Sequence, residues 1–191
     1  MDAPTRVLIA EDETIIRLDL RSLLEGSGFD VCGEARDGVE AIDLAETLSP
    51  DVIVMDIKMP RLDGIEAARR ILERKPVPIV MLTAFGQDDL VRRAVDTGVF
   101  GYLAKPFREQ DVIPALIAAQ ARHAEFVEVK LQASSLLEAL EARKAIERAK
   151  GILMAKEGLT EDEAFARLRR ASQRSGRPMK VIADAVAATL G

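Results

Sequence analysis

The sequence has few of the residues that build a disulfide-bonded or membrane-spanning protein. Its 191 residues include a single cysteine, Cys32, so no internal disulfide can form. The apolar setting of Cys32 favours a buried structural thiol over a reactive one. No apolar run approaches the roughly 18 residues that cross a bilayer. The N-terminus leads directly into a strand-like run, so we expect no signal peptide, no membrane partner and a cytoplasmic protein.

Acidic residues are also missing from one stretch of the chain. Residues 1–124 carry 15 Lys and Arg against 22 Asp and Glu, whereas residues 125–191 carry 12 against 10. Within the second part, residues 164–180 hold six cations and no carboxylate. Hydrophobic content of 48% and charged content of 31% indicate a folded globular chain. The uneven charge therefore predicts two domains with different partners.

Short strand-like runs alternate with amphipathic helical stretches over the first 120 or so residues. Stretches such as Ile15–Gly26 and Val39–Leu48 have helical length and pattern. Five strands separated by helices are typical of an α/β fold, in which helices cover both faces of a parallel sheet. The strand candidates are Val7–Ala10, Asp30–Gly33, Val52–Met55, Ile79–Leu82 and Val99–Leu103.

No strand pattern returns after Pro106. Helix-forming sequence runs from Gln110 to about Lys156 and ends near Gly158; a capping box at Thr160 and a break at residues 176–178 predict two short helices after it. Within the long helix, apolar residues recur at steps of three and four over two heptads. That length leaves two alternatives open, a dimerising coiled coil and a helix that packs on its own domain. The stripe consists of Phe126, Val129, Ala133, Leu136 and Leu140.

Three carboxylates follow two strands that a doubly wound sheet places side by side. Glu11 and Asp12 follow the first strand, and Asp56 follows the third. Because the carboxyl ends of parallel strands form the ligand crevice, we expect these side chains to converge. Such a cluster would repel itself without a cation. Mg²⁺ fits best, because it accepts carboxylates and keeps positions for waters and a phosphate oxygen.

Two further polar residues end the fourth and fifth strands, Thr83 and Lys105. A hydroxyl and an ammonium at the same edge would bind the oxygens of a phosphoryl group on Asp56. In-line transfer needs a carboxylate nucleophile, a cation and donors for the equatorial oxygens. A single acid after a strand is usually a helix cap, but five such residues at four strand ends are hard to explain as caps. The Lys105–Pro106 bond is a candidate for the cis form.

These residues resemble the receiver domain of bacterial response regulators. The similar motifs are Glu11-Asp12, the run Val54–Pro60 with Asp63-Gly64, Thr83-Ala84 and Lys105-Pro106. The resemblance covers residues 5–122 and implies a flavodoxin-like, five-stranded, doubly wound domain over residues 1–122. It implies Asp56 as phosphoacceptor, a sensor histidine kinase as phosphodonor, and a switch rather than an enzyme with a separate substrate. The implied Mg²⁺ ligands are Glu11, Asp12, Asp56 and the backbone carbonyl of Lys58; Thr83 and Tyr102 form the implied switch pair, and Lys105 contacts the phosphate.

The basic stretch of the second part has two readings. Arginines at spacings of three and four, Arg167, Arg170, Arg174 and Arg177, form either a solvated helix face or a surface for a polyanion. The lack of neighbouring acids favours the polyanion, and nucleic acid is the obvious one. Aromatic residues are scarce there, and we expect Phe165 to belong to the core with Ala164 and Leu168. Recognition by a stacking sheet is therefore not expected.

The second part also resembles a known output domain, the ANTAR domain. The similar segments are Arg143–Met154, with Ala149-Lys150-Gly151 at its centre, then Thr160–Phe165 and Leu168–Ser172. The resemblance spans roughly residues 130–191 and follows a helical linker over residues 123–140. It implies a small three-helix domain that binds RNA hairpins in nascent transcripts and prevents transcription termination, with a linker that commonly dimerises. The candidate RNA contacts are Arg143, Lys144, Lys150, Arg167, Arg170, Arg174 and Arg177.

The sequence thus predicts a two-component response regulator that controls transcription termination through RNA. Phosphorylation of Asp56 would change the receiver surface, promote a homodimer or free the tail, and so change RNA affinity. A DNA-binding regulator is one alternative, and a protein-interaction adaptor without nucleic-acid binding is another. A metal-dependent phosphatase built on the acidic cluster finds no support in a general acid or a substrate pocket.

Overall fold

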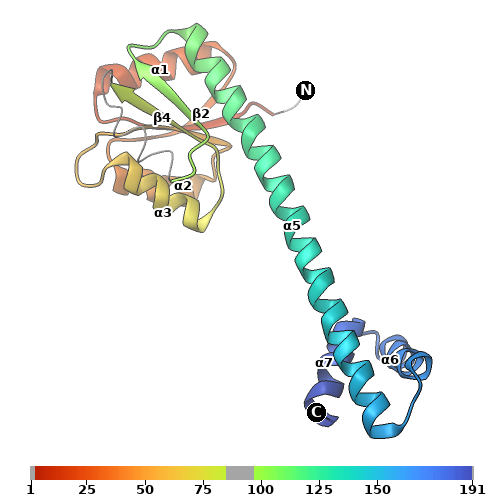
Figure 1. The fold of residues 1–191 in the computed structure, drawn as a ribbon. Coiled ribbons are helices and arrows are strands. Elements are labelled where there is room, and N and C mark those ends of the chain that lie inside the picture. Colours follow the sequence, from red (N-terminus) through yellow and green to blue (C-terminus); the bar gives the residue numbers. More distant parts are fainter. Residues whose placement is uncertain (1–2, 85–96, 191) are drawn as a thin grey trace. The chain divides into compact units, whose positions relative to one another are not determined.

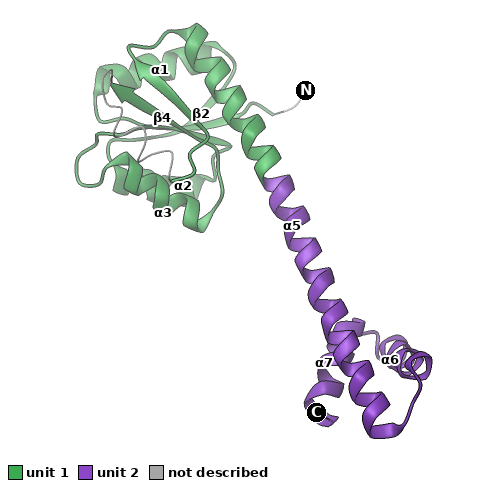
Figure 2. Ribbon diagram, viewed as in Figure 1, with its two compact units in different colours: residues 1–126 green, residues 127–191 purple. Residues whose placement is uncertain are grey.

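The chain forms two compact units, residues 1–126 and residues 127–191, which Figure 2 draws in different colours. The structure is a computed structural model, and it describes residues 3–84 and 97–190. Among these residues, no helix is both long and apolar enough to cross a membrane.

A five-stranded parallel sheet forms the centre of the first unit (Figure 1). Its order is β2-β1-β3-β4-β5, so β3 lies in the middle with β1 and β4 beside it. The predicted doubly wound fold is confirmed, and the fifth strand begins two residues later than predicted. The strands are β1 (Arg6–Ala10), β2 (Asp30–Ala35), β3 (Val52–Asp56), β4 (Ile79–Ala84) and β5 (Gly101–Lys105).

Alternate residues of the strands build two apolar layers, because successive side chains point to opposite faces of a sheet. Ile53 and Met55 pack with residues of α2 (Gly38–Leu48) and α3 (Gly64–Arg74). Val52 and Val54 pack with residues of α1 (Thr14–Gly26) and with the start of α5 (Glu109–Glu157) on the other face. The helix expected between β4 and β5 falls on residues 85–96, outside the described residues.

The second unit is a three-helix arrangement with a small core. The last part of α5 packs against α6 (Glu161–Ser175) and α7 (Met179–Leu190). Gly158 ends α5 with φ 68°, and Thr160 and Glu163 form the predicted capping box. The buried core residues are Ala149, Leu153, Ala164, Leu168 and Ala183.

The predicted apolar stripe of the long helix lies outside this core. Val129 is 59% exposed, Leu136 is 72% exposed and Leu140 is 48% exposed. Packing on the core of the second unit, which was one of the two alternatives, therefore does not account for these side chains.

Asp37 fixes the start of α2. Its Oδ1 accepts the backbone N–H groups of Val39 (2.9 Å) and Glu40 (3.0 Å), and its Oδ2 accepts from Arg61 Nε (2.8 Å). Burial raises the pKa of the Asp37 carboxyl, but the Arg61 guanidinium and the two N–H groups lower it more, so the pKa lies below its ordinary 3.8. A depressed pKa contributes stability that is present above the unfolded-state pKa and is lost as pH falls through the folded-state value.

Replacing Asp37 with alanine is expected to lower the free energy of unfolding by about 1 kcal/mol at neutral pH, the usual cost of losing an N-cap. The difference from wild type should shrink as the pH falls below the ordinary pKa of 3.8, because the wild-type carboxyl gains its proton there. Urea unfolding followed by the fluorescence of Tyr102, the one tyrosine of the chain, reports on this unit.

The matched variant is Asp37→Asn, since asparagine caps helices about as well as aspartate. Its smaller loss measures the contribution of the charge that faces Arg61. A gap between wild type and Asp37→Ala that stays constant with pH would contradict this account.

Candidate functional site

The three predicted carboxylates meet at the carboxyl edge of the sheet. Glu11 and Asp12 follow β1, Asp56 ends the neighbouring β3, and one carboxylate oxygen of each lies within 4.8 Å of the others. Glu11 and Asp56 are buried, whereas Asp12 is exposed. The sequence prediction that these side chains converge is therefore met by the geometry.

Lys105, at the end of β5, supplies positive charge to this cluster. Its Nζ lies 2.7 Å from Glu11 Oε2 and 2.8 Å from Asp56 Oδ1. Burial lowers the pKa of the Lys105 ammonium, but the two carboxylates outweigh that effect and raise it above its usual value. The Lys105–Pro106 peptide bond is cis.

The two buried acids are poorly compensated. Burial raises the pKa of the Asp56 carboxyl, and Lys105 opposes that shift without cancelling it. Burial also raises the pKa of the Glu11 carboxyl; Lys105 lowers it and the charge of Asp56 raises it further. A site of converging carboxylate oxygens with excess negative charge suits a hard divalent cation such as Mg²⁺, so the donor set fits this metal.

Both oxygens of Asp56 are held in place. Lys105 contacts Oδ1, and the backbone N–H of Lys58 donates to Oδ2 at 3.1 Å. The following loop packs tightly, because Gly64 N donates to Ile57 O at 2.8 Å. A Cβ added at Gly64 would lie 1.9 Å from the backbone oxygen of Asp56. Asp63-Gly64 is part of the receiver motif in the sequence, but this close approach of Gly64 to the Asp56 carbonyl is visible only in the structure.

Thr83 and Tyr102 lie on neighbouring strands. Thr83 pairs with Ala104, and Tyr102 pairs with Met81, so Thr83 and Tyr102 share one face of the sheet. Thr83 is buried, and its hydroxyl donates to the carbonyl of Ala84 at 3.3 Å. Tyr102 is half-buried and packs against the core beside α2 and α3.

The seven basic residues predicted to contact RNA divide into two groups. Three of them are paired: Lys144 with Glu141, Lys150 with both Glu147 and Glu161, and Arg167 with Glu157. The Lys150 side chain is also buried. The other four are exposed and have no ion pair with a carboxylate of residues 3–84 or 97–190: Arg143, Arg170, Arg174 and Arg177.

Two details of α6 differ from the sequence prediction. The helix ends at Ser175 and Gly176 follows with φ 66°, in agreement with the predicted break at residues 176–178, but Arg177 then lies beyond the helix and not on the predicted arginine face. Phe165, expected in the core, is 42% exposed, and that expectation was wrong. Ala164 and Leu168, which are four residues apart and therefore share one helix face, are buried instead.

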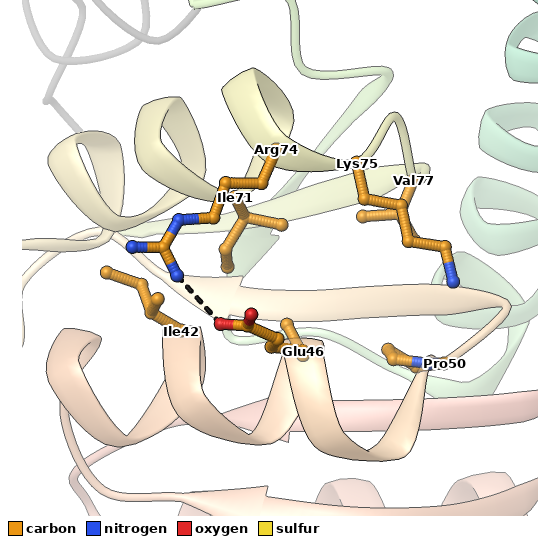
Figure 3. Close-up of a pocket in the computed structure, with 8 residues that line it drawn as sticks. Ile42, Glu46, Pro50, Ile71, Arg74, Lys75 and Val77 are labelled. Atoms are coloured by element: carbon orange, nitrogen blue, oxygen red, sulfur yellow. Dashed lines mark hydrogen bonds and ion pairs between the residues drawn. The ribbon is translucent and has the colours of Figure 1, made fainter.

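A cavity of about 160 Å³ opens between α2 and α3 (Figure 3). Ile42, Ile71 and Val77 line it, and an ion pair of 2.7 Å between Arg74 and Glu46 crosses it. None of the predicted site residues lines this cavity.

Comparison with known proteins identifies both units. The family model of the response regulator receiver domain matches residues 7–117, and that of the ANTAR domain matches residues 134–186. The transcriptional regulatory protein PdtaR of Mycobacterium tuberculosis is 50% identical over 188 residues, which cover 98% of this chain and 92% of the relative. The chemotaxis protein CheY of Thermotoga maritima is 37% identical over 112 residues, 58% of this chain and 93% of its own.

Solved structures agree for the first unit. The receiver domain of a modulated diguanylate cyclase from Desulfovibrio desulfuricans G20 superposes with a TM-score of 0.60 at 34% identity, over 63% of this chain and 97% of that one. A CheX–CheY–BeF₃–Mg²⁺ complex from Borrelia burgdorferi gives a TM-score of 0.58 at 28% identity, over 60% of this chain and 88% of that one.

The fold and these matches define a response regulator of a two-component system. More particularly, the chain belongs to the response regulators that join an N-terminal receiver domain to a C-terminal ANTAR domain. Both resemblances seen in the sequence are thereby confirmed.

Replacing Gly64 with alanine is expected to destabilise the first unit, because the new methyl group would collide with the Asp56 carbonyl. Overpacking of this kind costs about 1–3 kcal/mol. Gly26→Ala is the matched control, since a Cβ there meets no atom of the described residues within 4 Å. Thermal unfolding of both variants tests this, and equal melting temperatures would contradict it.

Proposed function

We propose that the chain takes a phosphoryl group on Asp56 from a sensor histidine kinase and thereby controls the binding of its ANTAR domain to RNA hairpins in nascent transcripts. The binding would regulate transcription termination. The observation that carries the proposal is the buried Asp56 carboxylate, held between Lys105 and the Glu11–Asp12 pair at the carboxyl edge of the sheet.

Phosphoryl transfer requires that an oxygen of Asp56 attack the phosphorus of a phosphohistidine in line with the leaving nitrogen. The P–O bond forms as the P–N bond breaks, and the histidine nitrogen leaves with the electron pair. Lys105 and the Lys58 N–H orient the carboxylate before attack. Lys105 then neutralises a phosphoryl oxygen, and the Thr83 hydroxyl donates to another. The chain acts in this way as a switch and not as an enzyme with a separate substrate.

Glu11, Asp12, Asp56 and the backbone carbonyl of Lys58 would hold Mg²⁺. When bound, the ion neutralises charge on the transferred group. The excess of carboxylate over ammonium charge at this edge supports the assignment. One similar structure, the CheX–CheY complex, holds BeF₃ and Mg²⁺.

Phosphorylation adds roughly −1.5 to −2 charges and strong acceptor oxygens at Asp56. Thr83 would turn from the Ala84 carbonyl toward those oxygens, and Tyr102, on the same face, would follow into the vacated space. The surface of β4 and β5 would then differ between the two states. This is the change that the rest of the chain would detect.

RNA binding by the ANTAR domain draws support from its uncompensated arginines. Four arginines are exposed and form no ion pair with a carboxylate in the described parts of the chain, so they are available to bind phosphate: Arg143, Arg170, Arg174 and Arg177. The exposed ring of Phe165 adds a surface on which an unstacked base could lie. A similar protein, PdtaR, is named a transcriptional regulatory protein.

The linker would form a homodimer in the phosphorylated state. Its apolar residues Val129, Leu136 and Leu140 are exposed at heptad spacing, which suits a second copy of the helix. Sedimentation velocity with and without a phosphodonor distinguishes a phosphorylation-dependent dimer from a constant monomer.

The domain limits of 1–122, 123–140 and 130–191 remain predictions.

Asp56→Asn is expected to abolish phosphorylation of the chain by acetyl phosphate or by a phosphorylated kinase, because the nucleophilic oxygen is lost. Removing Mg²⁺ with a chelator should stop the reaction of the wild type. Intact-mass analysis detects the added phosphoryl group. Asp51→Asn serves as control, because Asp51 is an exposed carboxylate at the opposite end of β3. Phosphorylation of the Asp56→Asn protein at the wild-type rate would contradict the proposal.

Two variants of α6 are expected to weaken binding to hairpin RNA in different ways. Arg170→Gln should weaken it and flatten the dependence of log affinity on log salt by about 0.7–0.9, the value of one lost phosphate contact. Phe165→Ala should weaken binding about 10-fold with an unchanged salt slope, because stacking is not ionic. Fluorescence anisotropy across a salt series measures both.

Arg74→Gln, an arginine of the receiver domain paired with Glu46, is the control and should leave RNA affinity unchanged. Duplex DNA of matched length is the competitor. Tighter binding to duplex DNA would favour a DNA-binding regulator, and absence of binding to either would favour a protein-interaction adaptor.

A further inference from the structure

Arg17, near the start of α1, is buried and contacts the backbone that carries the acidic pair. The residue is 6% exposed. Its Nη1 donates to the backbone carbonyl of Glu11 at 2.7 Å and to that of Asp12 at 3.4 Å. A guanidinium that binds two successive carbonyls fixes the backbone conformation of Glu11 and Asp12, whose carboxylates belong to the acidic cluster.

The guanidinium is itself anchored to the sheet. Its Nε donates to Glu34 Oε2 at 3.1 Å, and Glu34 lies on β2, paired with Ile9 of β1. The other oxygen of Glu34 accepts from Arg21 Nη1 at 2.7 Å. Arg17 therefore links β2 to the loop after β1. Arg21 shares the same carboxylate but, within the part of the chain that the structure describes, its side chain binds Glu25 and Glu34 and not the loop.

Few other contacts fix this loop among the described residues: the backbone N–H of Glu11 donates to the carbonyl of Ala35 at 3.0 Å, and the Glu11 side chain contacts Lys105. The residue at the N-cap position of α1, Glu13, forms no side-chain capping hydrogen bond. The Glu11 carboxylate accepts from the backbone N–H of Glu13 at 3.2 Å, so its position follows the backbone of residues 11–13. A planar guanidinium with five donors can bind Glu34 and two carbonyls at once, and a lysine ammonium cannot reproduce that fork.

We propose that Arg17 is a positioning residue of the Mg²⁺ site. It acts through the backbone of Glu11 and Asp12 and sets the geometry in which their carboxylates meet Asp56. The inference rests on the proposed function, because it requires that the acidic cluster binds Mg²⁺. Residues that orient metal ligands without touching the ion typically change metal affinity 10–100-fold when they are replaced.

The test is a calorimetric titration of the full-length chain with MgCl₂, well below the unfolding temperature. Arg17→Lys keeps the charge and loses the fork, and it should weaken Mg²⁺ binding about 10-fold or more. Arg21→Gln is the matched control. It removes the other partner of Glu34 and leaves the loop contacts in place, so its Mg²⁺ affinity should stay within about twofold of wild type.

A second measurement separates positioning from a general loss of structure. The rate of phosphorylation of Arg17→Lys by acetyl phosphate should be low at limiting Mg²⁺ and should recover at saturating Mg²⁺. Glu34→Gln keeps Arg17 but weakens its anchor, and it should weaken Mg²⁺ binding several-fold; it carries the test if Arg17→Lys does not fold.

Wild-type Mg²⁺ affinity in Arg17→Lys or, if that variant does not fold, in Glu34→Gln would overturn the inference. So would an Arg21→Gln protein as weak as Arg17→Lys, or a rate that stays low at saturating Mg²⁺. These outcomes leave the proposed function standing, since wild type would still bind Mg²⁺ and accept phosphate. A wild-type chain that binds no Mg²⁺ would instead overturn the proposed function and the inference together.

Discussion

The receiver site depends on one interaction, the contact of the Lys105 ammonium with the carboxylates of both Glu11 and Asp56. Burying a carboxylate costs several kcal/mol unless a partner compensates it, and Lys105 is the described cation that contacts both Glu11 and Asp56. Three carboxylates against one ammonium leave the cluster with excess negative charge, and burial, which Lys105 opposes only in part, keeps the pKa values of Glu11 and Asp56 raised. A better balanced site would be more stable as it stands, but it would have less to gain from a divalent cation. The excess negative charge that destabilises the fold therefore also favours the binding of the divalent cation that the proposed chemistry needs.

The sheet tolerates these buried charges because its polar groups gather at one edge, outside the apolar core. β3 is the central strand, and its residues 52–55 are buried among apolar side chains on both faces. Asp56 is the last residue of β3, and its carboxylate lies at the carboxyl edge of the sheet. Ala10, the last residue of β1, pairs with Met55, and Leu82 of β4 pairs with Asp56, so Glu11 and Thr83 each follow directly beside Asp56. Position along parallel strands, and not the identity of a connecting segment, thus determines which side chains share the site.

That rule explains how much of the site could be predicted from the sequence. The five strands, the acidic cluster and Lys105 follow from residue type and strand ends alone. Gly64 and Arg17 do not, because their importance lies in close tertiary approaches, of an added Cβ to the Asp56 carbonyl and of a guanidinium to the loop carbonyls. Arg17 looks in the sequence like an ordinary polar residue of an amphipathic helix. Phe165 was misplaced because an aromatic beside Ala164 and Leu168 was assumed to share their buried face, and one residue of helical rotation moves it into solvent.

The basic residues of the ANTAR domain differ in whether a carboxylate already pairs with them, and this difference matters more for RNA binding than their number. Lys150 bridges Glu147 of its own helix and Glu161 at the start of α6, so it fastens two helices of the small core. A cation already neutralised by two carboxylates would release few counterions on meeting a phosphate, and it would have to break both contacts first. Arg170 and Arg174 carry no such cost in the described structure. If RNA is the ligand, its affinity should therefore depend on these unpaired arginines, while Lys150 preserves the geometry in which α6 presents them.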